Sequence, residues 1–288
     1  MNYLENLERA ISYIEENLTD EIKFDEIAKQ SGFSIFYFQR IFSAVCGCSV
    51  GQYIRNRRLA VSAAELKATK AKVIDIALKY GYESPESFTR AFVKFHGITP
   101  SEAKKSDSVL KSYSRLSVKI NLKGGNIMNY KIIKKEAFKV LEKVSSQSID
   151  DAQNKNTIPE FWTKSHQDGT VAKLLSLADD RKYIFGICYN GELTGKKTFE
   201  YSIAASYSEG TEIPDGFRIN EIPERTWIVF DCVGAMPTAM QQTWHNILAE
   251  FFPSTSYEPT YEMDIEAYTA GEMNSPDYKS EIWVPIKY

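Results

Sequence analysis

Apolar residues recur at helical spacing twice in the first third of the chain. The first run falls at i, i+3, i+4 and i+7, at Phe38, Ile41, Phe42 and Val45. The second run repeats this spacing fifty positions later, at Phe88, Ala91, Phe92 and Phe95. Each run predicts a helix with one apolar stripe, and Ser34 can cap the first of these helices.

Each predicted helix follows a glycine and a shorter helical segment. Gly32 and Gly81 stand where the chain must turn, and glycine readily adopts the positive φ that such a turn needs. Ala28 and Ala77 precede these glycines, and their small side chains let two helices cross closely. A unit of helix, turn and helix that is used twice predicts a double helix-turn-helix domain.

One face of the first of these helices is left open by its apolar stripe. It carries Phe36, Tyr37, Gln39, Arg40 and Ser43. The paired hydrogen-bonding groups of Arg and Gln match guanine and adenine edges in the major groove. For an isolated helix, a solvated face on a helical bundle is the commoner explanation, but the repeat favours DNA binding. Residues 49–67 predict a spacer helix of about 28 Å at ~1.5 Å per residue, close to the ~34 Å between successive major-groove faces.

Alternation with a period of two replaces helical spacing after residue 129 and predicts an α+β domain. The predicted strands are 130–134, 138–144, 183–189, 198–205, 217–222, 227–233, 257–268 and 278–286, with helices at 158–166 and 236–252. They form two βαββ-type halves about a pseudo-twofold axis, with a groove between them. We expect an all-α double helix-turn-helix domain at 1–107, a linker at 108–128 and the α+β domain at 129–288.

Charge is distributed unevenly over these predicted domains. The net charge of −3 divides into +1 for residues 1–107, +4 for residues 108–128 and −8 for residues 129–288. Arg57 and Arg58 lie in a basic run of the spacer helix that suits the phosphates of double-stranded DNA. We therefore expect the first domain, and not the acidic second one, to contact DNA.

Other classes of site find little support in the composition. No apolar run approaches the ~20 residues of a membrane span, so we expect a cytoplasmic protein without membrane contact. Cys46 and Cys48 lack a second pair or a neighbouring histidine, and the three histidines are scattered, which disfavours a metal site or a catalytic triad. We expect no metal, no cofactor and no enzymatic activity.

The first domain resembles the AraC/XylS family of DNA-binding proteins. The second repeat carries the family signature in VIDIALKYGYESPESFTRAFVKFHGITPSEAKK, and the first repeat carries its counterpart in FDEIAKQSGFSIFYFQRIFSAVCGCS. The resemblance implies that the helices at 34–45 and 85–95 enter adjacent major-groove segments of DNA. It also implies RNA polymerase as a partner. Because one chain already carries two reading helices and has no heptad seam for a dimer, we expect it to bind DNA as a monomer.

Base-contacting positions of this family align with four residues of the chain: Phe36, Gln39, Arg40 and Arg90. The relatives carry polar glutamines where this chain has Pro85 and Glu86. A proline and an acid cannot make the same contacts with bases. We therefore expect a second reading helix that binds through phosphates and Arg90 and that selects sequence less strictly than the first.

The second domain resembles the gyrase-inhibitor-like effector-binding domain. The segments that carry this resemblance are IPEFW at 158–162, FGICYN at 185–190, PTYEMDIEAY at 259–268 and SEIWVPIKY at 280–288. The resemblance implies a small-molecule effector, an organic cation, held by a buried glutamate among aromatic rings. The residues expected at this site are Glu262, Trp162, Tyr189, Tyr201, Trp227 and Glu281.

Three alternatives for the second domain stay open at this point. Its aromatic rings can form the core while its acids face solvent, because the alternation around Glu262 permits either arrangement. Some related domains resemble small hydrolases, in which Glu262 or Glu281 with Tyr189 or Tyr261 would activate water. The domain can also dock a protein partner in place of a small molecule.

Overall fold

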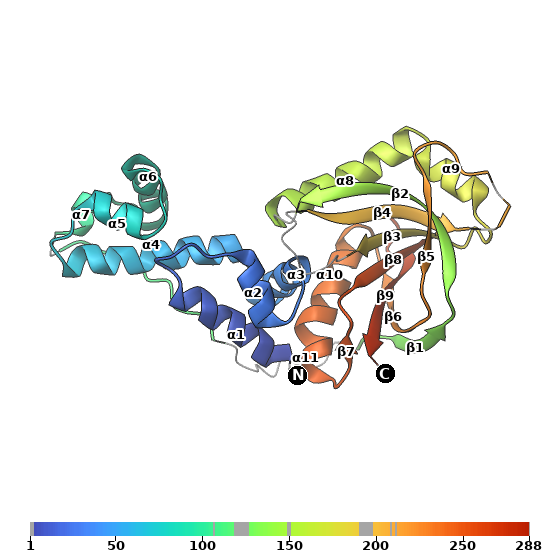
Figure 1. The fold of residues 1–288 in the computed structure, drawn as a ribbon, viewed down its shortest axis with the longest axis horizontal. Coiled ribbons are helices and arrows are strands. Elements are labelled where there is room, and N and C mark those ends of the chain that lie inside the picture. The colour runs from blue at the N-terminus through green and yellow to red at the C-terminus, as the bar shows by residue number, and fades with distance from the viewer. Residues whose placement is uncertain are drawn as a thin grey trace. The chain divides into compact units, whose positions relative to one another are not determined.

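The computed structural model of the chain describes residues 3–105, 107–117, 127–148, 151–189, 198–207, 209–210 and 212–287. The chain forms two compact units (Figure 1). The first unit comprises Met1–Gly32 and Cys46–Ile120, and the second comprises Phe33–Val45 and Asn121–Tyr288. Helix α3 (Ile35–Cys46), which contains the first apolar stripe, thus lies almost wholly in the second unit. Residues 118–126 of the predicted linker lie outside the described residues.

The first unit is helical throughout its described elements. These are α1 (Tyr3–Glu16), α2 (Phe24–Ser31), α4 (Val50–Ala68), α5 (Val73–Lys79), α6 (Pro85–His96) and α7 (Pro100–Ala103). The spacer helix predicted between the two repeats is confirmed as α4. A buried cluster of Leu59, Leu66, Ile76, Phe88 and Phe92 joins α4, α5 and α6.

Local sequence signals fix where these helices begin and end. Gly32 and Gly81 have φ values of 67° and 77°, which confirms the predicted turns. Ser84 accepts a hydrogen bond of 3.2 Å from the backbone N–H of Ser87, so its side chain caps α6. Thr99 and Glu102 form a capping box at the start of α7.

The second unit adds a sheet and further helices to α3. In chain order they are β1 (Tyr130–Lys135), β2 (Phe138–Ser148), α8 (Asp151–Gln167), α9 (Thr170–Leu177), β3 (Tyr183–Tyr189), β4 (Thr198–Ser206), β5 (Arg218–Ile222), β6 (Arg225–Val233), α10 (Thr238–Asn246), η1 (Ile247–Phe251), α11 (Phe252–Ser254), β7 (Glu258–Pro259), β8 (Met263–Thr269) and β9 (Lys279–Lys287). The predicted α+β class is confirmed.

The sheet has the internal symmetry that the sequence predicts. Its strand order is β1-β6-β9-β8-β3-β4-β2-β5, and β7 pairs with β9. The first half runs β2-α8-β3-β4 and the second runs β6-α10-β8-β9, so each is a βαββ unit. The halves meet where β3 pairs antiparallel with β8, with Cys188 opposite Asp264 and Gly186 opposite Glu266.

Alternation along the strands sends side chains to two separate buried clusters. On one face Ile187, Trp227, Ile265 and Trp283 belong to a single apolar core. On the other face Leu141, Leu174, Cys188, Phe199, Tyr201 and Ile203 form a second cluster, which Phe36 of α3 joins. Figure 1 shows α3 beside α10 on the side of the sheet that also carries helices α8 and α9.

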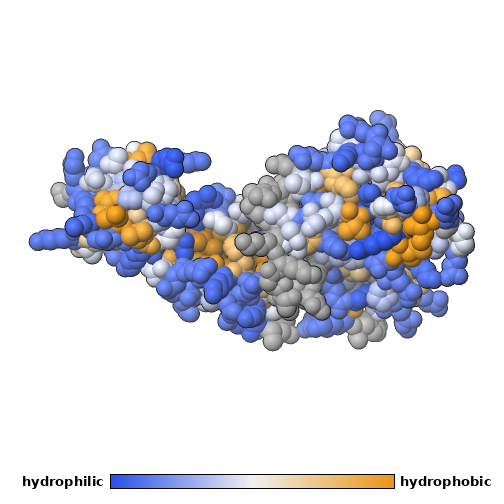
Figure 2. Space-filling view, turned by 45° about the horizontal axis from the view of Figure 1, so that its top comes forward, coloured by the Kyte–Doolittle hydropathy of each residue, from blue (hydrophilic) through white to orange (hydrophobic). Residues whose placement is uncertain are grey.

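Hydrophilic residues dominate the molecular surface that faces the viewer in Figure 2, with smaller hydrophobic patches between them. Exposed apolar residues of the first unit include Ile74, Leu78 and Val93. Within the described part of the chain, no helix has the length and apolar character that crossing a membrane requires.

Candidate functional site

Two acidic side chains and a tyrosine project from β8 toward the face of the sheet that carries the helices. They are Asp264, Glu266 and Tyr268, which alternate with the core residues of the opposite face. Asp264 is only 2% exposed, and Glu266 is half-buried. A carboxylate buried this deeply needs a charged or hydrogen-bonding partner, because an isolated charge is strongly disfavoured away from water.

Helix α10 and strand β8 together orient Glu266. The indole Nε1 of Trp244 donates a hydrogen bond of 2.8 Å to Oε1 of Glu266. The hydroxyl of Tyr268 donates a bond of 2.8 Å to Oε2 of the same carboxylate. Burial raises the pKa of Tyr268 well above its usual value, so this hydroxyl stays a neutral donor.

Helix α8 contributes a second aromatic pair to this site. Trp162 Nε1 donates a hydrogen bond of 2.8 Å to the hydroxyl of Tyr201, and its ring meets that of Tyr268 edge-on at 5.2 Å between centroids. Gly186 makes room for this pair, since a Cβ at its position would lie 2.2 Å from the Tyr201 hydroxyl. We call Trp162, Tyr201, Trp244, Asp264, Glu266 and Tyr268 the acidic-aromatic site.

The acidic-aromatic site holds a cation that belongs to the chain itself. Arg40 of α3 donates a hydrogen bond of 2.8 Å from Nη1 to Oδ2 of Asp264. Its guanidinium carbon lies 4.0 Å from the centroid of the Trp244 ring, within the range of a cation-π interaction. Burial by itself lowers the pKa of Arg40, but Asp264 opposes this effect and the pKa is raised above its usual value. The site therefore stabilises a positive charge that is largely buried.

The expected DNA-reading residues occupy two different environments. Phe36 and Gln39 are 8% and 7% exposed, and the Arg40 side chain is 18% exposed, all within the second unit. The expectation that α3 presents these residues on an open face is wrong for this structure, because the sheet and α10 cover them. Arg90 lies exposed on α6, and its contact with DNA stays a prediction.

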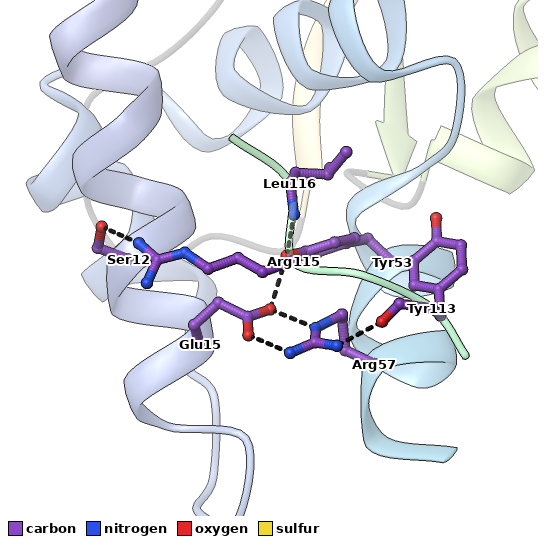
Figure 3. A network of polar contacts seen from close by, with 7 residues as sticks. All are labelled: Ser12, Glu15, Tyr53, Arg57, Tyr113, Arg115 and Leu116. Atoms are coloured by element: carbon purple, nitrogen blue, oxygen red, sulfur yellow. Dashed lines mark hydrogen bonds and ion pairs between the residues drawn. The ribbon is translucent and has the colours of Figure 1, made fainter. Parts of the chain in front are cut away.

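Arg57 and Arg58 form hydrogen bonds inside the first unit, and Figure 3 shows those of Arg57. Arg57 forms two hydrogen bonds, of 2.8 and 2.7 Å, with the carboxylate of Glu15, and Tyr53 adds a third of 2.6 Å to that carboxylate. Arg58 donates to the backbone carbonyls of Leu18 and Asp20. Both arginines tie α4 to α1 and the turn that follows it, and their expected contact with DNA phosphates stays a prediction.

Glu262 is not the buried carboxylate that the sequence led us to expect. Its side chain is 57% exposed and forms an ion pair with Arg225. The reason lies one residue earlier, where Tyr261 has a φ of 62° and interrupts the predicted strand. Strand β8 begins only at Met263, so the buried acidic position is Asp264.

The other expected ligand-binding residues divide between the two faces of the sheet. Trp162 and Tyr201 belong to the acidic-aromatic site, whereas Tyr189 and Trp227 pack in or against the opposite core. Glu281 pairs with Lys131 at 2.9 Å and accepts a bond of 2.8 Å from Trp283. Although burial opposes it, the bond from Lys131 lowers the pKa of Glu281, which favours a charged surface pair.

The opposite core contains a further buried carboxylate that the sequence reading missed. Glu142 is 0% exposed, and Tyr189 donates to it at 2.5 Å and Ser202 at 2.7 Å. Arg218 completes this network through a bond of 2.7 Å. Tyr189 therefore has Glu142 as its acidic partner, in place of the Glu262 or Glu281 that a hydrolase mechanism had suggested.

Asp264, Glu266, Trp244 and Tyr268 are the residues of the site that sequence reasoning did not select. Their alternation along one strand was visible, but the register that buries Asp264 depends on where β8 begins. Beside Tyr268, a hollow of about 500 Å³ opens between α9 and the ends of β3 and β8. Within the described residues, no group of three or more His, Cys, Asp or Glu side chains is arranged to hold a metal ion.

Comparisons with known proteins match both parts of the chain. Residues 131–286 match the family described as integron-associated effector binding protein, and residues 27–106 match a helix-turn-helix domain family. The transcriptional activator AarP of Providencia stuartii is 44% identical over 96 residues, which cover 33% of this chain and 71% of AarP. The regulatory protein SoxS of Escherichia coli K12 is 37% identical over 102 residues, or 35% of this chain and 95% of SoxS.

The solved structures of similar fold include that of SAV2435 bound to tetraphenylphosphonium, with a TM-score of 0.50 and 22% identity. The match covers 56% of this chain and 94% of SAV2435. The chain belongs to the AraC/XylS family of DNA-binding transcriptional regulators, and its second part belongs to the integron-associated effector-binding proteins.

Proposed function

We propose that this transcriptional regulator senses an organic cation through the acidic-aromatic site. The observation that carries the proposal is the buried contact of Arg40 with Asp264 and Trp244. A site that stabilises a guanidinium at 2.8 Å from a 2%-exposed carboxylate has the charge and the aromatic walls that a cationic effector requires. The net charge of −8 on residues 129–288 favours a positive ligand for the same reason.

The site is better suited to a delocalised cation than to a compact ammonium. A delocalised cation is weakly hydrated, so less free energy is lost when it leaves water for an aromatic cavity. Glu266 is held in place by Trp244 and Tyr268 and adds a second negative charge beside Asp264. The fold relative SAV2435, described with tetraphenylphosphonium bound, supports the choice of such a cation as the probe.

DNA recognition in this proposal uses the residues that the family resemblance indicates. Phe36, Gln39 and Arg40 of α3 contact base edges in one major-groove segment, and Arg90 of α6 does so in the next. RNA polymerase is the proposed protein partner of the DNA-bound regulator. Transcription reconstituted with purified polymerase on a selected binding site tests that partnership.

The cation proposal is tested by calorimetry with the full chain. Because Arg40 pairs with Asp264, the comparison is made in an Arg40→Met background, where the Arg40 guanidinium no longer competes with the probe. We expect Asp264→Asn in this background to weaken tetraphenylphosphonium binding ten-fold or more, on the order of 1.4 kcal/mol. Glu262→Gln, which removes the same charge two residues earlier at an exposed position, should leave the affinity within about two-fold.

Neutral triphenylphosphine oxide serves as the uncharged control ligand. It should bind more weakly than the cation and respond little to Asp264→Asn, since no charge pairs with the carboxylate. If only Glu262→Gln weakened tetraphenylphosphonium binding, Glu262 and not Asp264 would be the carboxylate that binds the cation, as the sequence suggested. Absence of cation binding to every folded variant would end the proposal.

A further inference from the structure

Helix α3 presents its DNA-reading side chains to the sheet of the second unit and not to solvent. Phe36 and Gln39 are almost fully buried there, and Arg40 is the residue that reaches the acidic-aromatic site. These are the residues that the family resemblance assigns to base contacts. In this arrangement they are unavailable to DNA.

Two side chains one helical turn apart anchor α3 on the sheet. The ring of Phe36 lies 3.9 Å from that of Phe199, measured between centroids. Arg40, four residues later, pairs with Asp264 and lies over Trp244. The Arg40 guanidinium carbon is 5.4 Å from the Phe36 ring centroid. Together they present an aromatic ring and a delocalised cation, which is the chemistry of the proposed effector.

A third contact holds α3 without involving the acidic-aromatic site. The ring of Tyr261 lies 4.6 Å from Tyr37 and 4.8 Å from Phe33, again between centroids. Tyr261 belongs to the short connection between β7 and β8. This contact can be weakened by mutation while Asp264 and Trp244 stay intact.

The docked helix leaves polar groups unsatisfied. Within the described residues, the Tyr37 hydroxyl and Oε1 of Gln39 are buried without a hydrogen-bond partner. Burying a polar atom without a partner is unfavourable, so these groups favour release of the helix. The contacts of Phe36 and Arg40 help to outweigh that effect, and a ligand that takes their place removes two of the three contacts that hold the helix.

We propose that Phe36 and Arg40 act as an internal ligand of the effector site, which an aromatic cation displaces to release α3 for DNA binding. This inference rests on the proposed function, because it gives the same site an occupant in the unliganded state. Cation and α3 exclude one another, so the effector raises DNA affinity. By thermodynamic reciprocity, DNA raises cation affinity by the same factor. The effector that fits best carries a delocalised cation and an aromatic ring about as far apart as in this pair.

Cation binding to full-length variants gives the first test. Arg40→Met removes the internal cation, so we expect tetraphenylphosphonium to bind at least ten-fold more tightly than it binds the unmodified protein. Arg90→Met removes the corresponding arginine of α6 and should leave cation affinity unchanged while it weakens DNA binding. Equal cation affinity of the unmodified protein and Arg40→Met would overturn the inference and leave the proposed cation site standing.

DNA binding without any cation gives the second test. Fluorescence anisotropy is measured on a duplex that the full-length protein selects from random sequences. Asp264→Asn removes the carboxylate that holds Arg40 and should raise DNA affinity at least ten-fold. Glu262→Gln changes the net charge equally and should change DNA affinity less than two-fold, which separates release of α3 from weaker repulsion of phosphates.

Tyr261→Asn keeps the test decisive if Asp264→Asn folds poorly. Asparagine tolerates the positive φ of this position, and the change removes the ring that packs on Tyr37 and Phe33. We expect it to raise both DNA affinity and cation affinity, since it weakens α3 docking and leaves the acidic-aromatic site complete. Unchanged DNA affinity in folded Asp264→Asn and in Tyr261→Asn would refute the internal-ligand role.

The two proposals fail in different ways. If Asp264→Asn and Tyr261→Asn raise DNA affinity while no variant binds tetraphenylphosphonium, the contact of α3 stands and the cation effector fails. If the unmodified protein binds the cation and neither variant alters DNA binding, the effector stands and the internal ligand fails. Tetraphenylphosphonium added to the unmodified protein should raise DNA affinity only if both are correct.

Discussion

Arg40 donates a hydrogen bond to Asp264, a residue 224 positions further along the chain. The arginine comes from a helix with a family-assigned role in reading DNA, and the aspartate comes from a sheet with a family-assigned role in binding effectors. This pair therefore connects, in one contact, the two parts of the chain to which the family assigns these roles. Removing one partner of such a buried pair leaves the other charge uncompensated, so a competitor for Asp264 must itself be positively charged.

Arg57→Met should lower the stability of the protein without a specific effect on phosphate binding. The change removes both hydrogen bonds from Arg57 to Glu15, and these bonds join α4 to α1. It also leaves the Glu15 carboxylate partly buried without its charged partner. We expect a loss of about 2 kcal/mol in the free energy of unfolding, measured with urea. Arg55→Met, at an exposed position of the same helix, should change stability by less than about 0.5 kcal/mol.

The salt dependence of DNA binding distinguishes this role from a phosphate contact. A phosphate-directed Arg57 would flatten the slope of log K against log salt by about one unit when it is replaced. We expect Arg57→Met to leave that slope unchanged under conditions in which the variant is folded. A flatter slope with unaltered stability would restore the interpretation drawn from the basic run.

The same network predicts a loss of stability in acid. Burial opposes ionisation of Glu15, but the bonds from Arg57 and Tyr53 lower its pKa below the value of the unfolded chain. A carboxyl whose folded pKa is depressed contributes stability that is fully present above the unfolded pKa. That stability is lost as the pH falls through the folded pKa.

Urea unfolding at a series of pH values below about 5 measures this contribution of Glu15, whose unfolded pKa is about 4.3. We expect Arg57→Met to lose less stability than the unmodified protein between pH 5 and the acid limit of folding, because its Glu15 no longer has a depressed pKa. Parallel curves for the two proteins would show that the Glu15 bond contributes no pH-dependent stability.

The two reading helices should differ in how strictly they select DNA sequence. Helix α6 begins with Pro85 and carries an exposed Glu86, and neither side chain donates hydrogen bonds to base edges. Selection from random DNA should return one sharp half-site and one degenerate half-site. Arg90→Ala should weaken specific binding by roughly 1–3 kcal/mol and erase the remaining preference in the degenerate half-site. Two equally sharp half-sites would contradict this assignment.

Gly186→Ala should destabilise the second unit by overpacking. The new Cβ would lie 2.2 Å from the Tyr201 hydroxyl and 3.3 Å from the ring of Trp162. We expect a loss of about 1–3 kcal/mol in the free energy of unfolding. Tyr201→Phe removes the closest atom, so the double variant should lose less than the sum of the two single changes, as a double-mutant cycle would measure. If the losses of the two single variants added in the double variant, the contact with the Tyr201 hydroxyl would not be the source of the strain.

Sequence alone determined the features that depend on neighbouring residues. Apolar spacing defined the helices of the repeat, Gly32 and Gly81 marked their turns, and period-two alternation gave the paired halves of the sheet. These features follow from local backbone geometry and from which side chains avoid water. The order of residues along the chain is therefore enough to predict them. The family resemblance, which rests on short sequence motifs, added the expected base-reading positions.

Only the tertiary structure decided which charged groups meet. The positive φ of Tyr261 interrupts the extended backbone before β8, so Asp264 lies buried within the strand whereas Glu262 lies outside it and is exposed. Arg57 donates to Glu15, which is 42 positions away in the sequence, and Arg40 donates to Asp264, which is 224 positions away. The spacing of residues along the chain does not predict such pairs. A carboxylate and a guanidinium attract one another through space, and only the fold sets the distance between the two groups.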